Sequence, residues 1–217
     1  MPDFAERRRM MVDTQIRPSD VTKYPIIEAM LAVPREIFVP AEKKEAAYLG
    51  ENVDLGSDRV LLEPRTLAKA LDALDIQPDE LVLDIGAGTG YSAAVMSRLA
   101  EAVIAIEEDE SLLSDAQGPL SEIGADNVVL ENGVLTEGAP QHGPYDVIIL
   151  QGAAEHMPEG ILAQLKEGGR IAAIFADGEL GTVRIGYKID GDMHWRFSFN
   201  AAAPVLPGFE RHRAFTL

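Results

Sequence analysis

A run of glycines and two acids have the residue types and spacing that could do chemistry. Asp84 precedes Gly86, Gly88 and Gly90 in the stretch LDIGAGTGYS, and Glu107 ends the apolar stretch EAVIAIE. Glycines let the backbone approach a ligand closely, because no side chain obstructs it. A carboxylate near such a loop can accept hydrogen bonds from amino or hydroxyl groups. The pattern indicates a small ligand held between a glycine loop and two acids.

The glycine spacing separates two classes of cofactor. A dinucleotide site favours GxGxxG, in which the start of a helix meets a pyrophosphate. Here the spacing is GxGxG, and Tyr91 stands where the dinucleotide pattern needs glycine. Asp84 would oppose a phosphate but can accept bonds from a cationic or amino group. Both facts favour S-adenosylmethionine, which carries no phosphate, over the nicotinamide cofactor of a dehydrogenase.

Glu107 has two readings. At the end of a second strand, an acid can accept hydrogen bonds from both hydroxyls of a ribose. Alternatively, the run from Glu107 to Glu110 is a set of acids favoured by a helix N-terminus. The second reading accounts for Glu108 and Glu110, whereas Glu107 itself falls at the strand end. We therefore expect Glu107 to bind the ribose.

The scaffold for these residues is predicted from alternating segments. Short apolar strands are expected at 80–86, 101–107, 126–133, 145–154 and 170–178, and helices at 91–100, 110–124 and 158–169. Apolar strands separated by helices indicate parallel pairing with both sheet faces covered. Residues 183–190 and 193–199 alternate apolar and polar side chains, which predicts an antiparallel hairpin. The fold class expected is α/β, a doubly wound, mainly parallel Rossmann-like sheet with a C-terminal hairpin.

An N-terminal helical appendage precedes this sheet. Residues 4–11 are expected to be helical, and a second helix has Pro25 in its first turn. Pro34 and Pro40 bracket an extended piece, and a helix with one buried leucine stripe follows Pro64. We expect a single domain over 1–217, in which 1–63 form the helical, acceptor-side segment and 64–217 the cofactor-binding core.

Composition narrows the class of protein. The 36 acidic residues outnumber 19 basic ones and give a net charge of −17, which disfavours partners such as nucleic acid or an anionic membrane. Cysteine is absent, which excludes disulfides and thiolate chemistry. The N-terminus lacks the apolar core of a signal peptide. The four histidines are scattered and are expected on the surface or in the hairpin, with no metal site. A cytoplasmic location is expected.

The whole chain resembles the protein-L-isoaspartate O-methyltransferase family of class I S-adenosylmethionine-dependent methyltransferases. The most specific part is TQIRPSDVTKYPIIEAMLAVPREIFVP, which is similar to the family's N-terminal helices and its Val-Pro-Arg-Glu-x-Phe-Val-Pro stretch. The likeness continues through VLDIGAGTGYSAAVMSRL, NVVLENG, PYDVIILQGAA and ILAQLKEGGR. It therefore covers nearly the full length.

The resemblance implies methyl transfer from S-adenosylmethionine to the α-carboxyl of an isoaspartyl residue in a damaged protein. The resulting ester collapses to a succinimide, which permits protein repair. A carboxylate is already nucleophilic at neutral pH, so the site needs alignment and exclusion of water more than acid-base groups. By the same resemblance, residues 151–158 form one wall of the acceptor site. The cofactor residues implied are Asp84, Gly86, Ala87, Gly88, Gly90, Glu107, Asn132 and Gly133.

Three positions depart from the family pattern. Aligning on Pro64 places Leu62 where the family's Ile-Ser-x-Pro or Ile-Thr-x-Pro signature has a hydroxyl, with Glu63 beside it. A leucine cannot donate a hydrogen bond to an acceptor carboxylate. The family's Gly-Asp-Gly becomes Gly133-Val134-Leu135, so Asn132 would have to stand in for the acid near the adenine. Glu155 stands where the family commonly has proline.

Arginines near the altered signature offer a replacement for the lost hydroxyl. Arg59 and Arg65 flank it, and Arg17 lies in the segment that the family folds over its site. An arginine fork can hold a carboxylate bidentately, although for any one of the three a solvated arginine is the simpler interpretation. Leu62, Arg59 and Arg65 are thus the candidate acceptor-site residues. Two alternatives stay open, namely the same fold acting on another acceptor and a catalytically silent protein that binds S-adenosylmethionine. The oligomeric state is not predicted.

Overall fold

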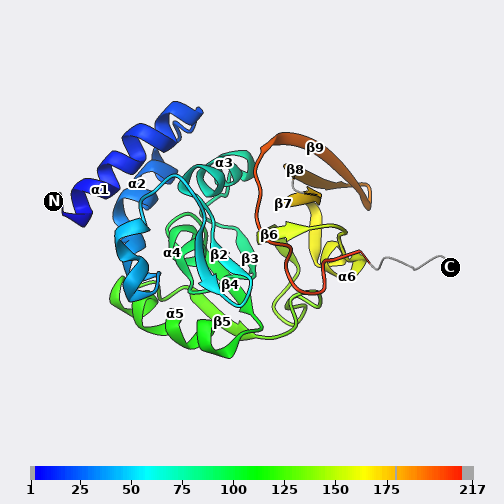
Figure 1. Ribbon diagram of the computed structural model, residues 1–217. Coiled ribbons are helices and arrows are strands. Elements are labelled where there is room, and N and C mark those ends of the chain that lie inside the picture. The colour runs from blue at the N-terminus through cyan, green and yellow to red at the C-terminus, as the bar shows by residue number, and fades with distance from the viewer. Residues whose placement is uncertain (1–2, 179, 212–217) are drawn as a thin grey trace.

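A seven-stranded sheet forms the centre of the computed structural model, which describes residues 3–178 and 180–211 (Figure 1). The strand order is β5-β4-β3-β6-β7-β8-β9. The strands are β3 (Leu81–Ile85), β4 (Ala102–Glu107), β5 (Val128–Asn132), β6 (Tyr145–Ala154), β7 (Leu165–Asp177), β8 (Leu180–Ile189) and β9 (Asp192–Asn200).

Pairing follows the pattern expected from the sequence. Strands β5, β4, β3, β6 and β7 run parallel to one another, and β8 and β9 continue the sheet as antiparallel strands. The β8–β9 turn places Asp190 and Gly191 at φ of 54° and 81°, the left-handed conformation that a tight hairpin requires. The parallel sheet with a C-terminal hairpin is therefore confirmed.

Helices α3 (Pro64–Leu74), α4 (Tyr91–Met96), α5 (Glu110–Glu122) and α6 (Glu159–Ala163) connect the strands. Pro64 occupies the first turn of α3, and Asp109 caps α5 by accepting hydrogen bonds from the Ser111 and Leu112 amides. Helix α5 ends at Glu122, close to the expected residue 124, whereas two other helices are clearly shorter than predicted. The helix expected over 158–169 ends at Ala163, because Leu165 already pairs with Tyr145 in the sheet. The helix expected over 91–100 ends at Met96.

The N-terminal segment contains the two predicted helices, α1 (Phe4–Met11) and α2 (Tyr24–Ala32). Residues 12–19 between them continue as π-helical and 3₁₀ turns, and two further 3₁₀ turns cover 35–37 and 41–46. A small antiparallel hairpin of β1 (Val53–Gly56) and β2 (Arg59–Leu61) follows, which the sequence did not predict. This hairpin carries Leu55 and Arg59, which lie near the glycine loop and Glu107.

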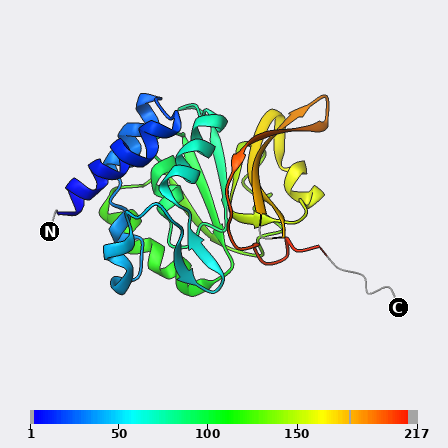
Figure 2. The same ribbon diagram turned by 45° about the horizontal axis from the view of Figure 1, so that its top comes forward.

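Two hydrophobic clusters cover the two faces of the sheet. One joins the N-terminal helices to α3, α4 and one face of the strands, through side chains such as Met30, Leu71 and Val82. The other lies on the opposite face and includes Leu83 and Ile148. The alternation of Val82 and Leu83 between the clusters is the period-two pattern of a strand buried on both faces. Figure 2 shows the N-terminal helices on one side of the molecule and the β8–β9 hairpin on the other.

Candidate active site

Asp84 and Glu107 lie close to the carboxyl ends of the neighbouring strands β3 and β4. In the register, Asp84 is opposite Ala105 and Glu107 is opposite Asn132 of β5. Strand β3 is also the point where the chain order reverses, since β4 flanks it on one side and β6 on the other. Ligands of open α/β sheets bind beyond the carboxyl ends at such a switch point. The fold therefore brings the two predicted acids together at the carboxyl ends of the strands, where a ligand is expected.

The glycine loop after β3 has the backbone that glycine permits. Gly86, Gly88 and Gly90 have φ of 74°, 56° and 89°, a region that other residues rarely adopt. The Gly86 and Ala87 amides donate to the carbonyl of Ile106 at 2.9 and 3.2 Å, which ties the loop to β4. A Cβ on Gly90 would meet the Ala116 side chain at 3.2 Å, so this glycine lets the loop pack against α5.

Asp84 is fully buried and held by two side chains. Ser92 Oγ donates to one carboxylate oxygen and Gln151 Nε2 donates to the other, each at 2.6 Å. Burial raises the pKa of Asp84 to about 7, against the lowering effect of these two hydrogen bonds, and the charge of Glu107 adds to the rise. Gln151 was expected only as part of the acceptor wall, 151–158, and its contact with Asp84 was not predicted. The available signal was a single polar residue near the end of the apolar strand β6.

Glu107 is fully buried and paired with Arg59. Its Oε1 lies 3.1 Å from Arg59 Nη2, and Arg59 Nε lies 3.2 Å from both carboxylate oxygens. The Gly88 amide donates to Oε2 at 3.0 Å, and the amides of Glu108 and Asp109 donate to Oε1 at 2.9 and 3.1 Å. The Arg59 side chain is 2% exposed. Arg59 is therefore no solvated arginine, and its fork is directed at the acid expected to bind ribose.

The other two arginines lie nearer the surface. Arg65 Nη1 lies 3.7 Å from Glu63 Oε1, and its guanidinium carbon lies 5.7 Å from the centre of the Phe199 ring. Arg17 pairs with Asp13 one helical turn away at 3.2 Å, and both side chains are more than half exposed. Of the two candidate acceptor-site arginines, Arg65 therefore has a longer ion pair with its acid than Arg59 has with Glu107.

Leu62 is buried, and its backbone is fixed by a buried arginine. Arg35 Nη2 donates to the Leu62 carbonyl at 2.6 Å, and Arg35 Nε donates to the Ala47 carbonyl at 2.6 Å. The Arg35 guanidinium also lies over the Tyr91 ring, 4.8 Å from its centre. Arg35 belongs to the Val-Pro-Arg-Glu stretch, but the sequence offered no role for it. Through the Leu62 carbonyl it fixes the altered signature beside the glycine loop.

The residues expected near the adenine lie beside Glu107. The Asn132 side chain donates to the carbonyls of Glu107 and Glu108 at 3.2 and 3.4 Å, and the Gly133 amide donates to the Glu107 carbonyl at 3.2 Å. Asn132 is exposed, whereas Leu135 is fully buried. The departure from Gly-Asp-Gly therefore adds a core side chain next to the loop.

The expected acceptor wall, residues 151–158, is covered by residues 204–209, which we call the C-terminal strap. The Ala153 amide donates to the Pro204 carbonyl at 2.8 Å, and the Leu206 amide donates back to Ala153 at 2.9 Å. The Glu155 amide donates to the Phe209 carbonyl at 2.9 Å. In Figures 1 and 2 the chain after β9 returns between the glycine-loop half of the molecule and strands β6 and β7.

Leucines from two other segments cover the glycine loop. A Cβ placed on Gly86 would lie 3.0 Å from the Leu206 side chain, and one placed on Gly88 would lie 2.9 Å from the Leu55 side chain. Both glycines are buried. The residue types and strand-end positions fit S-adenosylmethionine, because a cradle without side chains lies between two acids. The protein's own leucines pack against this cradle.

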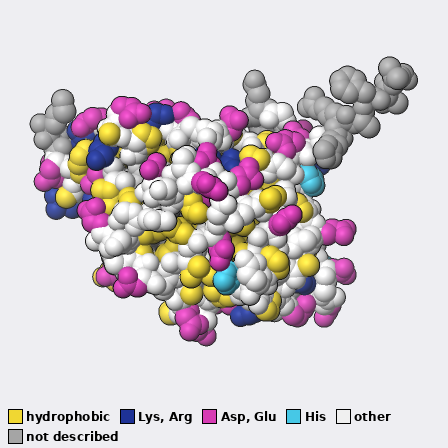
Figure 3. Space-filling view, turned by 90° about the horizontal axis from the view of Figure 1, so that it is seen from below, with side chains coloured by type: hydrophobic (Ala, Val, Ile, Leu, Met, Phe, Trp, Pro, Cys, Tyr) yellow, Lys and Arg dark blue, Asp and Glu magenta, His cyan; other side chains and the backbone are white. Residues whose placement is uncertain are grey.

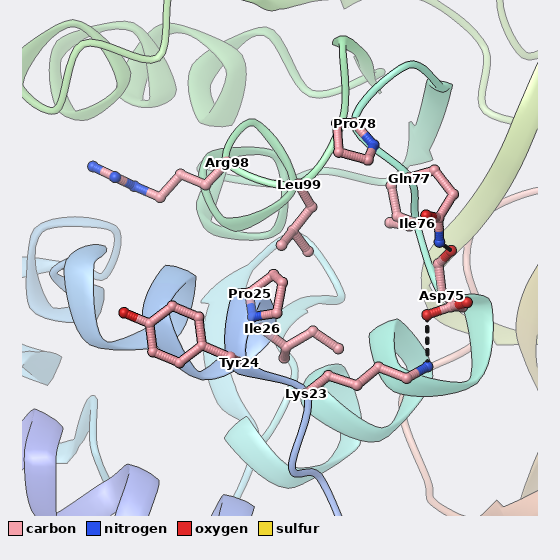
Figure 4. Close-up of a pocket in the computed structure, with 10 residues that line it drawn as sticks. All are labelled: Lys23, Tyr24, Pro25, Ile26, Asp75, Ile76, Gln77, Pro78, Arg98 and Leu99. Carbon is pink, nitrogen blue, oxygen red and sulfur yellow. Dashed lines mark hydrogen bonds and ion pairs between the residues drawn. The ribbon is translucent and has the colours of Figure 1, made fainter.

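A cavity of about 530 Å³ lies away from this site, near the amino ends of the parallel strands (Figure 4). It is bordered by the start of α2, by residues 75–78 just before β3 and by Arg98 and Leu99 just before β4. These segments lie at the amino ends of the strands, whereas open α/β sheets bind ligands at the carboxyl ends. Figure 4 shows Lys23 paired with Asp75 at its rim, at 2.8 Å. We assign no function to this cavity.

The histidines take separate positions. His142 Nε2 lies 2.5 Å from Glu131 Oε1, and His156 Nδ1 lies 3.2 Å from the Phe209 carbonyl oxygen. His194 is on β9, and His212 lies outside the described residues. Within residues 3–178 and 180–211, no three His, Cys, Asp or Glu side chains are grouped as metal ligands would be.

The sheet order, the glycine loop and the two strand-end acids define an α/β protein of the methyltransferase fold. The family model described as "Protein-L-isoaspartate(D-aspartate) O-methyltransferase (PCMT)" matches residues 6–185. The chain therefore belongs to this family.

Relatives support the same placement. The chain is 36% identical over 169 residues to a protein-L-isoaspartate O-methyltransferase of Roseiflexus castenholzii, covering 78% of this chain and 77% of the relative. It is 37% identical over 171 residues to the enzyme of that name from Syntrophus aciditrophicus, covering 79% and 78%. The likeness therefore extends through most of both relatives.

Solved structures agree on the fold. One protein-L-isoaspartate O-methyltransferase superposes with a TM-score of 0.81 at 26% identity, covering 93% of this chain and 66% of the solved chain. A putative member from Plasmodium falciparum, solved with S-adenosyl-L-homocysteine, gives a TM-score of 0.79 at 17% identity, covering 95% and 99%. The second likeness shows the fold alone.

Proposed function

We propose that the protein is an S-adenosylmethionine-dependent carboxyl methyltransferase that acts on the α-carboxyl of L-isoaspartyl residues in damaged proteins. The observation that carries this proposal is the family match over residues 6–185. It is supported by the position of Asp84 and Glu107 on adjacent strands at the switch point of the sheet. The activity would serve protein repair, because the methyl ester is the precursor of a succinimide.

Each part of the site has a role in this proposal. Asp84 and the glycine loop would hold the methionine part of the cofactor, Glu107 the ribose, and Asn132 and Gly133 the adenine end. When bound, S-adenosylmethionine supplies a methyl group on a positive sulfonium. An acceptor carboxylate needs no general base at neutral pH, because its ordinary pKa is about 4. The protein must orient the acceptor and exclude water.

The acceptor side is proposed to lie between the Leu62 signature and residues 151–158. Arg65 is the arginine proposed to approach an acceptor carboxylate there. Its 3.7 Å contact with Glu63 is long for an ion pair, and the Arg65 side chain is 41% exposed. An exposed pair of this kind contributes little to stability, so exchanging its partner costs little.

Charge favours a protein or peptide partner without a dense negative charge. The net charge of −17 opposes nucleic acid and anionic membranes as partners. Figure 3 shows acidic side chains spread over one face, with apolar side chains between them. No helix within the described part of the chain is long and apolar enough to cross a membrane. We propose that the enzyme acts in the cytoplasm.

The test is methyl transfer to a defined peptide. The full-length protein is incubated with methyl-labelled S-adenosylmethionine and an isoaspartyl peptide, and volatile label is measured after mild base. The matched control is the same peptide with a normal aspartyl residue. Base-labile label on the isoaspartyl peptide alone supports the proposal. Its absence at high enzyme concentration, while a characterised relative labels the same peptide, rejects the repair assignment.

A second candidate keeps the chemistry and changes the acceptor. It is favoured by Leu62, a buried apolar side chain where the family places a hydroxyl. It predicts label transfer to another component of a fractionated lysate and none to the isoaspartyl peptide. The other alternative, a catalytically silent protein that binds S-adenosylmethionine, predicts heat on titration with S-adenosylhomocysteine and no turnover on any acceptor. Transfer only to the isoaspartyl peptide rejects both alternatives.

A further inference from the structure

Glu107 has no acceptor position left for a ribose. A carboxylate offers about four lone-pair positions on its two oxygens. Here they receive three backbone amides, from Gly88, Glu108 and Asp109, together with the Arg59 guanidinium. The backbone donors belong to the loop and to the turn after β4, so they are fixed. Arg59 is the donor that can leave.

The cradle beside Glu107 is filled by apolar side chains from separate segments. A Cβ placed on Gly86 would lie 3.0 Å from Leu206 of the C-terminal strap and 3.8 Å from Leu135, and one placed on Gly88 would lie 2.9 Å from Leu55 of β1. Leu55 and Arg59 belong to the two strands of one small hairpin. Residues distant in sequence therefore converge on the surface where a cofactor would lie.

We propose that Arg59 is a cofactor-site residue that occupies Glu107 in place of the ribose, and that cofactor enters by displacing it. This inference rests on the proposed function, because it assumes that S-adenosylmethionine is the ligand. Arg59, Leu55 and Leu206 hold the crevice shut in the free protein. Cofactor affinity is then set by a competition between the guanidinium and the ribose hydroxyls for one carboxylate.

The β1–β2 hairpin can release its tip while its base stays in place. The base is anchored where Arg35 donates to the Leu62 carbonyl and where Asn52 Nδ2 donates to the Ala202 carbonyl at 2.8 Å. The tip residues Ser57 and Asp58 are exposed and have φ of 52° and 56°, a conformation unfavourable for residues with a side chain. Movement is therefore expected at the tip.

Arg59 and Leu55, two of the displaced side chains, have a place to go. Glu108 Oε1 lies 3.5 Å from Arg59 Nη2, and its side chain is 33% exposed, so the guanidinium can keep an acidic partner after leaving Glu107. A cavity of about 340 Å³ borders Leu55 and is also lined by Phe38, Thr89 and Leu112. Leu55 can turn into this space. Opening thus exchanges contacts and exposes no unpaired charge.

The experiment compares S-adenosylhomocysteine binding to the wild-type protein and to Arg59→Gln by titration calorimetry. Arg59→Gln removes the competing charge and leaves three backbone donors on Glu107. We expect its Kd to be at least tenfold lower than that of the wild type. Arg98→Gln is the matched control, since it removes an exposed arginine at the opposite edge of the sheet and should leave the Kd unchanged.

A second variant keeps the test decisive if Arg59→Gln fails to fold. Arg59→Lys retains a charge opposite Glu107 but loses the fork, so we expect tighter binding than in the wild type and weaker binding than in a folded Arg59→Gln. Equal Kd values for wild type and the folded Arg59 variants overturn the inference and leave the proposed function standing. No detectable heat with wild type and both variants instead rejects cofactor binding itself.

Discussion

Gln151 Nε2 lies 2.6 Å from Asp84 Oδ1, so an amide near the end of β6 holds the buried acid of β3. Ser92 holds the other carboxylate oxygen at the same distance. Even with both donors, burial raises the pKa of Asp84 to about 7. The acid therefore changes charge near neutral pH, so the free energy of unfolding depends on pH.

Stability should fall with rising pH because of Asp84. Its pKa is about 7 in the folded protein and near 3.8 when unfolded, so the folded state holds a proton that the unfolded state releases between these values. The contribution is complete below pH 4 and is lost as pH rises through about 7. The free energy of unfolding of wild type minus that of Asp84→Asn should fall by roughly 1.4 kcal/mol per pH unit across this window. Urea unfolding at several pH values measures it.

Asp54→Asn is the control for this slope. The exposed Asp54 carboxyl accepts a hydrogen bond from Lys43, which lowers the pKa of Asp54. The free energy of unfolding of wild type minus that of Asp54→Asn should therefore rise with pH instead of falling. A flat difference for Asp84→Asn between pH 4 and 7 would show that Asp84 has an ordinary pKa in the folded protein.

Arg35 should be required for stability. Arg35→Ala leaves the carbonyls of Ala47 and Leu62 without their donor and opens a cavity beside Tyr91. We expect a loss of about 3–5 kcal/mol in the free energy of unfolding, measured with urea. Arg17→Ala removes an exposed arginine and should change it by less than about 0.5 kcal/mol. Similar losses for both variants would contradict the role of Arg35.

Leu62→Ser should restore the hydroxyl that the family signature contains. A hydroxyl that bonds an acceptor carboxylate contributes about 1.5–3 kcal/mol, so kcat/KM for an isoaspartyl peptide should rise roughly tenfold or more. Loss of the buried leucine should also destabilise the fold by about 2–4 kcal/mol. Leu61→Ser is the matched control, because Leu61 is equally buried and precedes it in the chain. An equal effect of both variants on kcat/KM would show that Leu62 does not face the acceptor.

Local pattern predicted most of the fold. The apolar strands and the alternating β8–β9 pair carry their periods in the sequence, so parallel pairing of the former and antiparallel pairing of the latter could be predicted. The order of the strands across the sheet was not predicted. The β1–β2 hairpin could not, because strands of four and three residues around Gly56, Ser57 and Asp58 read as a loop. Helix ends were also misplaced, since pairing of Leu165 with Tyr145 depends on distant residues.

The site residues also divide into those that local pattern predicted and those that it did not. Asp84, Glu107 and the glycines follow from strand ends and could be placed from sequence alone. The contact of Arg59 with Glu107 joins residues 48 apart, and that of Gln151 with Asp84 joins residues 67 apart. Leu206 reaches Gly86 only because the chain returns along β6 after the final hairpin. Such contacts depend on packing of separate segments, for which a single sequence carries no local signal.

The most direct test of the central claim is the fate of the isoaspartyl group under turnover. An isoaspartyl peptide is incubated with the full-length protein and S-adenosylmethionine, and the isoaspartyl, succinimide and aspartyl forms are separated by chromatography over time. We predict that the isoaspartyl form declines and the other two accumulate, and that omission of either protein or cofactor prevents this. An unchanged isoaspartyl peptide, under conditions in which a characterised relative converts it, would contradict the account.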